Sequence, residues 1–391
     1  MNRELKKVLP MKIIIAMDSF KGSLSSMDVV NSVAKGIRKV LPEAELVTLP
    51  IADGGEGTVD TFLSAMGGRK YQVSVSDPIG RTTAATYCVL PDGTAVIEMA
   101  QASGLTLLKE DELDPLRTST YGTGELISHA LDQGCRRFIV GIGGSATNDG
   151  GAGMAQALGV QLFDRQGNIL PPGGAALAYL DKIDCSKKDS RLSESTFMVA
   201  CDVTNPLCGP QGAAAVYGPQ KGANKEDIAI LDDALMHYAH VLNTQLGIDI
   251  ALRPGAGAAG GLGAGLMAFC GAKVAPGIQT ILDAVKFESL LENADLVITG
   301  EGRIDAQSFC GKVPFGVAKR TKTVKNIPVI AVVGCVGEGA ESIHDAGVDA
   351  ILPITDKPMT LQYSMENADM LLQATAIRLI HLLQSGSVMV F

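Results

Sequence analysis

A glycine-rich segment, residues 141–159, constrains this chain more than any other part of its sequence. Seven of its nineteen residues are glycine, and the apolar run 138–140 precedes it. A buried strand that enters such a turn and continues into a helix leaves several backbone N–H groups free at the start of the helix. Those groups and the helix dipole favour phosphate or carboxylate. The segment therefore predicts a strand, an anion-binding turn and a helix.

Two polar side chains inside this turn, Asn148 and Asp149, indicate chemistry as well as structure. We expect Asp149 to face an open cleft at the helix start, where the helix dipole keeps its pKa low and its carboxylate ionised. Such a carboxylate can orient an attacking hydroxyl group, as phosphoryl transfer requires. The structural alternative is a helix cap, in which Asp149 only satisfies backbone N–H groups.

The same segment also fits a relaxed dinucleotide-binding pattern. Gly141, Gly143 and Ala146 have the spacing of that pattern, and Asp164 follows about twenty residues further on. Asp149 opposes this interpretation, because its negative charge would lie where a pyrophosphate binds. The pattern nevertheless leaves an alternative function, an NAD(P)-dependent oxidoreductase that acts on a small hydroxy acid. A non-catalytic sensor of such an acid is a third possibility.

Composition favours a cytoplasmic enzyme of two domains. A chain of 391 residues exceeds the size at which one hydrophobic core stops growing. A net charge of −9 and an aromatic content of 4% argue against a nucleic-acid partner. The uncharged run 254–272 is mostly glycine and alanine, which supply too little transfer free energy for a membrane span. The cysteines include no C-x-x-C pair and no signal peptide is recognisable, so we expect reduced thiols in the cytoplasm.

A strand–loop–helix rhythm occurs near both ends of the chain and is lost between them. The strands that we expect there are residues 12–16, 45–49, 295–299, 328–333 and 350–352. Residues 82–87 and 94–98 instead predict a hairpin. We therefore predict an α/β fold with two domains. Residues 1–77 and 279–391 form a discontinuous, three-layer, Rossmann-like domain with a mainly parallel sheet, and residues 78–278 form an inserted mixed α/β domain.

Three polar turns follow strands of the predicted parallel sheet. The carboxyl ends of parallel strands lie along one edge, where ligands bind. Glu56 and Glu301 form turns poorly and have glycine neighbours, which favours a functional interpretation. The side chains that we expect on this edge are Asp18, Lys21, Asp53, Glu56, Glu301 and Asp305.

As a set, the motifs of the chain resemble the bacterial glycerate kinase family of the type I, glycerate 2-kinase kind. They occupy residues 16–25, 52–58, 97–100, 122–126, 141–153, 200–206, 218–223 and 298–305, in the family's order. The resemblance implies a two-domain α/β enzyme that transfers the γ-phosphate of ATP to D-glycerate with Mg²⁺, giving 2-phosphoglycerate. It implies small-molecule substrates, with no nucleic acid and no membrane, and it leaves a homodimer open.

Phosphoryl transfer needs cations, magnesium ligands and a group that orients the attacking hydroxyl. As catalytic residues we predict Asp149, Asn148 and Lys21, with Asp149 accepting the proton of the glycerate hydroxyl. As contacts to substrate or phosphate we predict Asp18, Asp53, Glu56, Gly143, Gly144, Ser145, Lys221 and Arg303. As metal ligands we predict Asp202, Glu301 and Asp305.

Overall fold

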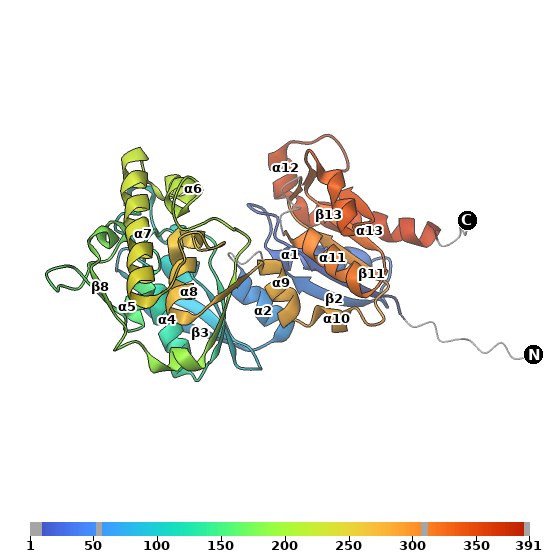
Figure 1. Cartoon of the computed structure of the whole chain (residues 1–391). Coiled ribbons are helices and arrows are strands. Elements are labelled where there is room, and N and C mark those ends of the chain that lie inside the picture. The colour runs from blue at the N-terminus through green and yellow to red at the C-terminus, as the bar shows by residue number, and fades with distance from the viewer. Residues whose placement is uncertain (1–9, 52–56, 306–311, 387–391) are drawn as a thin grey trace, which may run out of the picture. The chain divides into compact units, whose positions relative to one another are not determined.

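The computed structural model describes residues 10–51, 57–305 and 312–386 of the chain. The contacts within it divide the chain into two compact units (Figure 1). The first unit joins residues 1–52 to residues 281–391, and the second unit holds residues 53–280.

The first unit is built on a five-stranded parallel sheet with the strand order β15-β13-β11-β1-β2. Its strands are β1 (Lys12–Met17), β2 (Glu45–Pro50), β11 (Leu296–Gly300), β13 (Val329–Val333) and β15 (Ala350–Pro353). The pairing of β1 with β11 runs from Ile13 opposite Leu296 to Met17 opposite Gly300. One sheet therefore joins two parts of the chain that the whole second unit separates in sequence.

Helices cover both faces of this sheet, which makes three layers. They are α1 (Ser26–Arg38), α10 (Phe287–Leu290), α11 (Val313–Val324), α12 (Leu361–Glu366) and α13 (Ala368–Gly386), and a two-stranded sheet of β12 (Arg303–Ile304) and β14 (Cys335–Val336) lies beside them. Ile13, Ile15 and Met17 of β1 share a core with α1 and α13. Successive strand residues point to opposite faces, so Ile14 and Ala16 face the other side, where α11 packs on β11 and β1.

The second unit is built on a six-stranded mixed sheet with the order β10-β9-β6-β5-β4-β3. Its strands are β3 (Arg69–Ser76), β4 (Thr82–Val89), β5 (Thr94–Glu98), β6 (Arg137–Gly141), β9 (Thr196–Ala200) and β10 (Lys273–Ala275), and β7 (Gln161–Phe163) and β8 (Lys182–Asp184) form a separate hairpin. The strands β3, β4 and β5 are antiparallel, and those from β5 to β10 are parallel. The predicted hairpin corresponds to β4 and β5.

Strand β3 is where the structure differs from our predicted domain boundary. We assigned residues 53–77 to the first domain and predicted no strand there. In the structure, β3 pairs with β4 along its whole length, so it belongs to the second sheet. Most of its residues are exposed or half-buried. An edge strand of this kind lacks the continuous apolar run that marked the buried strands.

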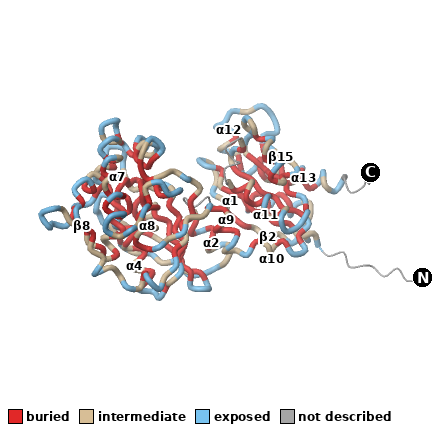
Figure 2. The backbone as a smooth tube through the Cα atoms, viewed as in Figure 1, coloured by how far each residue is buried: buried red, intermediate tan, exposed pale blue. Residues whose placement is uncertain are grey.

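Helices also pack around the second sheet, and in both units the buried residues gather on the strands and the inner sides of the helices (Figure 2). The helices of this unit are α2 (Thr58–Met66), α3 (Ala100–Ser103), α4 (Tyr121–Asp132), α5 (Ala152–Ala157), α6 (Ala213–Tyr217), α7 (Lys225–Leu246) and α8 (Leu262–Cys270). The division between the two units falls within the next helix, α9 (Gly277–Ala284). Within the described ranges, no helix has the length and apolar character that crossing a membrane would need.

Candidate active site

The glycine-rich segment forms the predicted strand, turn and helix. Strand β6 leads into the loop 142–151, and α5 follows it. A second glycine-rich turn packs directly against this loop, because the Gly150 N–H donates to the Gly260 carbonyl at 3.0 Å. A Cβ atom on Gly260 would lie 1.9 Å from the carbonyl oxygen of Thr147. The glycines at this contact therefore allow two backbones to meet without side chains between them.

Asp149 is fully buried at the end of this loop. Its carboxylate accepts hydrogen bonds from Thr120, at 2.8 Å from the backbone nitrogen and 2.9 Å from the hydroxyl. It also accepts from the backbone N–H groups of Gly151 and Gly153, both at 3.1 Å. Gly151 and Gly153 belong to the start of α5, and Thr120 is the N-cap residue of α4. One carboxylate therefore satisfies donors at the starts of two helices.

Two of our expectations for Asp149 are wrong. Its side chain does not face an open cleft, and burial raises its pKa, although the four hydrogen bonds act in the opposite direction. The helix start does bind an anion, but that anion is the chain's own carboxylate. In this structure Asp149 is the structural cap that we named as the alternative.

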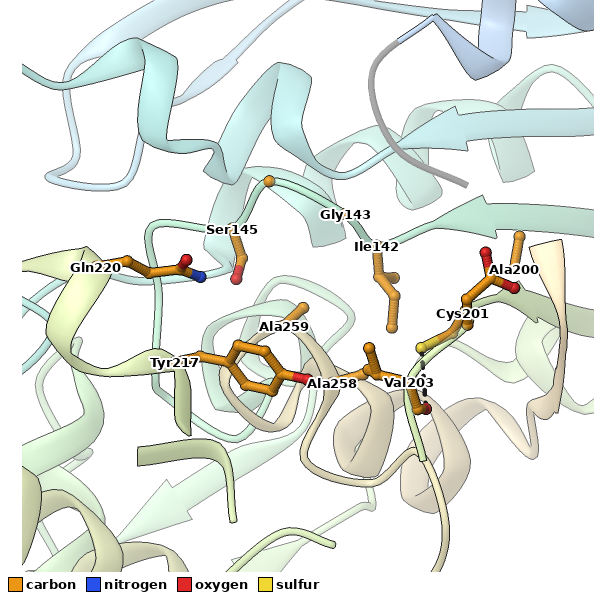
Figure 3. A pocket seen from close by; sticks show the side chains of 12 residues that line it. Ile142, Gly143, Ser145, Ala200, Cys201, Val203, Tyr217, Gln220, Ala258 and Ala259 are labelled. Atoms are coloured by element: carbon orange, nitrogen blue, oxygen red, sulfur yellow. Dashed lines mark hydrogen bonds between the residues drawn. The ribbon is translucent and has the colours of Figure 1, made fainter. Parts of the chain in front are cut away.

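A pocket of about 220 Å³ opens on the other part of the same loop (Figure 3). Residues 142–145, 200–203 and 258–259 line it together with Tyr217 and Gln220. The lining segments come from the carboxyl ends of the parallel strands β6 and β9, from α6 and from the second glycine-rich turn. This is the edge of a parallel sheet at which ligands characteristically bind.

Four of the predicted site residues come together in this pocket: Gly143, Gly144, Ser145 and Asp202. Asp202 carries the one charge among the residues that line it, and it accepts a hydrogen bond from the Gly277 N–H at 2.8 Å. The Ser145 hydroxyl forms no hydrogen bond with any residue that the structure describes. The pocket thus presents a hydroxyl group and a carboxylate on one small surface.

The prediction missed two residues of the pocket wall, Tyr217 and Gln220. The Tyr217 hydroxyl donates to Asn205 Oδ1 at 2.7 Å, which holds the ring at the pocket edge, and the Gln220 side chain extends toward Ser145 (Figure 3). Both lie within or beside the motif at residues 218–223, so their position in the sequence was the available signal. We had selected its lysine, the one charged residue of that motif, and passed over its neutral neighbours.

That lysine, Lys221, is fully buried and does not line the pocket. Its Nζ donates to the carbonyl oxygen of Thr147 at 2.6 Å. Burial lowers its pKa to about 7, and the carboxylate of Asp149 opposes this shift. Lys221 is therefore not among the residues that line this pocket, and its predicted contact with substrate phosphate stays a prediction.

In the first unit, Asp18 and Glu301 lie at the ends of two neighbouring strands, at the carboxyl edge of the parallel sheet. They follow Met17 and Gly300, which are opposite each other in the pairing of β1 and β11. The Asp18 N–H donates to the Gly300 carbonyl at 2.9 Å, and both acidic side chains are buried. Lys312 lies 3.5 Å from Glu301 in an ion pair. The two turns that carry these residues therefore begin side by side at this edge, and the joint role of their carboxylates stays a prediction.

The remaining predicted residues of this edge are distributed as follows. Arg303 and Asp305 form an ion pair at 3.1 Å, and Lys21 is exposed. Asp53 and Glu56 lie outside the described residues.

The three predicted metal ligands are divided between the units: Asp202 belongs to the second unit, whereas Glu301 and Asp305 belong to the first. Within the ranges that the structure describes, no three or more His, Cys, Asp or Glu side chains are grouped as a metal site would require.

The fold and the pocket define an α/β protein with a small pocket at the carboxyl ends of the parallel strands of its second sheet. The model of the glycerate kinase family matches residues 13–384. The chain is 50% identical over 365 residues to the glycerate kinase of Halalkalibacterium halodurans, which covers 93% of this chain and 96% of that protein. It is 48% identical over 359 residues to the glycerate 2-kinase of Escherichia coli K12, with coverages of 92% and 94%.

The fold leads to the same relatives. A crystal structure of a protein assigned as glycerate kinase 2 from Salmonella typhimurium LT2 superposes with a TM-score of 0.88 at 48% identity, covering 97% of this chain and all of that one. This chain belongs to the glycerate kinase family, as the sequence predicts.

The oxidoreductase alternative has no support. The family and the named relatives are kinases. In addition, the carboxylate of Asp149 already occupies the N–H groups at the start of α5, where the dinucleotide-binding pattern would place a pyrophosphate.

Proposed function

We propose that this chain is a glycerate kinase that transfers the γ-phosphate of ATP to D-glycerate and forms 2-phosphoglycerate. The observation that carries the proposal is the family match, which extends over almost the whole chain. The relative from Escherichia coli is named for the 2-kinase reaction, and this supports the 2-position as the site of phosphorylation. A cytoplasmic location and a homodimer stay predictions.

We propose that the pocket of the second unit binds the acceptor, D-glycerate. Its volume of about 220 Å³ suits a three-carbon acid. The backbone N–H groups of Gly143 and Gly144 donate no hydrogen bond to a described residue, and the Ser145 hydroxyl lies beside them. These donors suit the carboxylate of the acid. Asp202 suits a hydroxyl group, since an ionised carboxylate only accepts hydrogen bonds.

In this proposal Asp202 takes the role that we first gave to Asp149. It lines the pocket, whereas Asp149 is buried and saturated with hydrogen bonds. Phosphoryl transfer depends mainly on positioning and on neutralisation of charge, so a carboxylate that orients the attacking hydroxyl is a sufficient base. The proton of the glycerate hydroxyl would pass to Asp202 as the new oxygen–phosphorus bond forms and the bond to the leaving ADP breaks.

Magnesium and nucleotide contacts are a separate part of the proposal. The carboxylates of Asp18 and Glu301, at the ends of neighbouring strands, fit a hard cation that takes oxygen ligands, and Asp305 stays a further candidate ligand. Bound there, Mg²⁺ would neutralise charge on the phosphate oxygens. Lys21 and Arg303 are the candidates for contacts to phosphate. Mg²⁺ commonly uses only one or two protein carboxylates together with the phosphates of its substrate.

One assay tests the reaction directly. The purified protein should consume ATP when D-glycerate and Mg²⁺ are both present, and ³¹P NMR of the product should show 2-phosphoglycerate. Formation of 3-phosphoglycerate would contradict the proposed position, while leaving the kinase assignment intact. Reduction of NAD⁺ by glycerate without any use of ATP would contradict the assignment itself.

A further inference from the structure

Lys221 is a buried cation that the proposed reaction does not use. It ends the 3-10 turn at Pro219–Lys221, and Gly222 follows it in the left-handed conformation with φ at +98°. The side chain is fully buried, and its Nζ reaches the Thr147 carbonyl at 2.6 Å, across 74 residues of sequence. Burying a lysine is costly, so this arrangement needs an explanation.

The segment that Lys221 contacts has few side-chain hydrogen bonds of its own. The Thr147 hydroxyl and both polar atoms of the Asn148 amide are buried without a hydrogen bond to any described residue. Buried polar groups are normally paired, because leaving one unpaired costs free energy. The side chains of Thr147 and Asn148 therefore do little to hold the backbone at these two positions, and other contacts must do so. Those contacts include the hydrogen bond from the Thr118 hydroxyl to the Ala146 carbonyl at 2.9 Å, the bond from the Gly150 N–H to the Gly260 carbonyl, and the bond from Lys221.

Both ends of the contact lead into the proposed acceptor pocket. Thr147 follows the pocket residue Ser145 by two positions, and Lys221 directly follows the pocket residue Gln220. Ser145 and Gln220 both line this pocket, and the Gln220 side chain extends toward Ser145 (Figure 3). One hydrogen bond from a buried lysine therefore joins the two chain segments that carry these residues.

We propose that Lys221 is a positioning residue that holds the segment carrying Gln220 in place against the segment carrying Ser145, both of which line the acceptor pocket. The identity of the acceptor rests on the proposed function, but the coupling of the two segments does not. The charged group that faces Lys221 is the carboxylate of Asp149 in the same loop. Below about pH 7, where the lysine is protonated, it also places positive charge beside the buried anion that joins α4 and α5.

Steady-state kinetics test this role through Lys221→Met, which keeps the length of the side chain and removes its donors and charge. We expect the KM for D-glycerate to rise by about tenfold or more, while the KM for ATP changes by less than about threefold. Lys188→Met is the matched control. The Nζ of Lys188 also donates to a backbone carbonyl of the second unit, that of Phe269, at 3.3 Å, but Lys188 does not line the pocket. It should leave both KM values unchanged.

A second variant and a measurement without substrate complete the test. Lys221→Gln keeps an N–H donor on a shorter stem and should give a KM for D-glycerate between those of the wild type and Lys221→Met. Hydrogen exchange of the unliganded protein should be faster in residues 143–149 of Lys221→Met than in the wild type. This result would support the coupling even if the wild type failed to phosphorylate glycerate.

Three outcomes would overturn the proposal. Equal changes in the KM values for both substrates would show a general loss of structure. Unchanged exchange in residues 143–149 would show that the lysine does not hold this loop. Failure of both Lys221 variants to fold, with Lys188→Met folded, would assign Lys221 to the stability of the unit alone.

Discussion

Asp149 and Thr120 form a two-point contact in the interior of the second unit. The Thr120 backbone N–H and hydroxyl both donate to the Oδ2 atom of Asp149, at 2.8 and 2.9 Å. The same hydroxyl accepts a hydrogen bond from the Met154 N–H at 2.9 Å, so it links the carboxylate to α5 as well as to α4. The contact fixes the starts of two helices relative to each other and places the loop that lines the pocket.

Asp149→Asn should therefore affect stability before it affects chemistry. The carboxylate accepts four hydrogen bonds, and an amide would direct its NH₂ group at a backbone donor. It would also remove the anion beside the buried ammonium group of Lys221. We expect the free energy of unfolding to fall by about 2–4 kcal/mol, measured by denaturant titration. A variant of unchanged stability with greatly reduced turnover would restore Asp149 as the base.

Asp202→Asn should show the opposite pattern. Its amide oxygen can still accept the hydrogen bond from the Gly277 N–H, so stability should change little. Loss of the base should lower kcat by about 100-fold or more. Asp111→Asn, at an exposed position, is the control for a lost charge. Turnover within about threefold of the wild type would exclude Asp202 as the group that orients the acceptor hydroxyl.

Gly260→Ala and Gly209→Ala separate backbone strain from steric contact. Both glycines have positive φ, +67° and +89°, so each substitution carries the conformational cost of about 1–2 kcal/mol. A Cβ atom on Gly209 meets nothing within 4 Å, whereas on Gly260 it would lie 1.9 Å from the Thr147 carbonyl oxygen. Gly260→Ala should therefore lower the free energy of unfolding further than Gly209→Ala does, by an amount in the range typical of overpacking. Equal loss of stability in thermal unfolding would contradict the tight contact.

The buried lysine also predicts how stability depends on pH. The pKa of Lys221 is about 7 in the folded chain, and that of a lysine in the unfolded chain is about 10.4. Between these values the unfolded state binds a proton that the folded state has released, so stability from this group rises with pH. The free energy of unfolding of the wild type minus that of Lys221→Met should therefore increase by about 1.4 kcal/mol per unit from about pH 7.5 to about pH 9.5. A constant difference would show that the lysine keeps its usual pKa.

The local sequence pattern was sufficient to predict most of the parallel strands and the family. The strands around residues 12–16, 295–299 and 328–333 are continuous apolar runs, because both of their faces are buried under helices. Their polar exit turns had to begin at one edge, as those of Asp18 and Glu301 do, because the strands are parallel. Strand β3 was not predicted, because an edge strand buries only part of its surface and so lacks a continuous apolar run.

The roles of individual charges were decided only by tertiary structure. Asp149 and Lys221 have the residue types of an active site, and in the sequence both stand among the glycines that active sites favour. Whether such a group faces a ligand or the interior depends on contacts with residues far away in the chain, as those of Asp149 with Thr120 and of Lys221 with Thr147 are. A helix start attracts an anion in either case. Sequence determined that an anion would bind there, and the packing of α4 against α5 determined that the anion is the protein's own carboxylate.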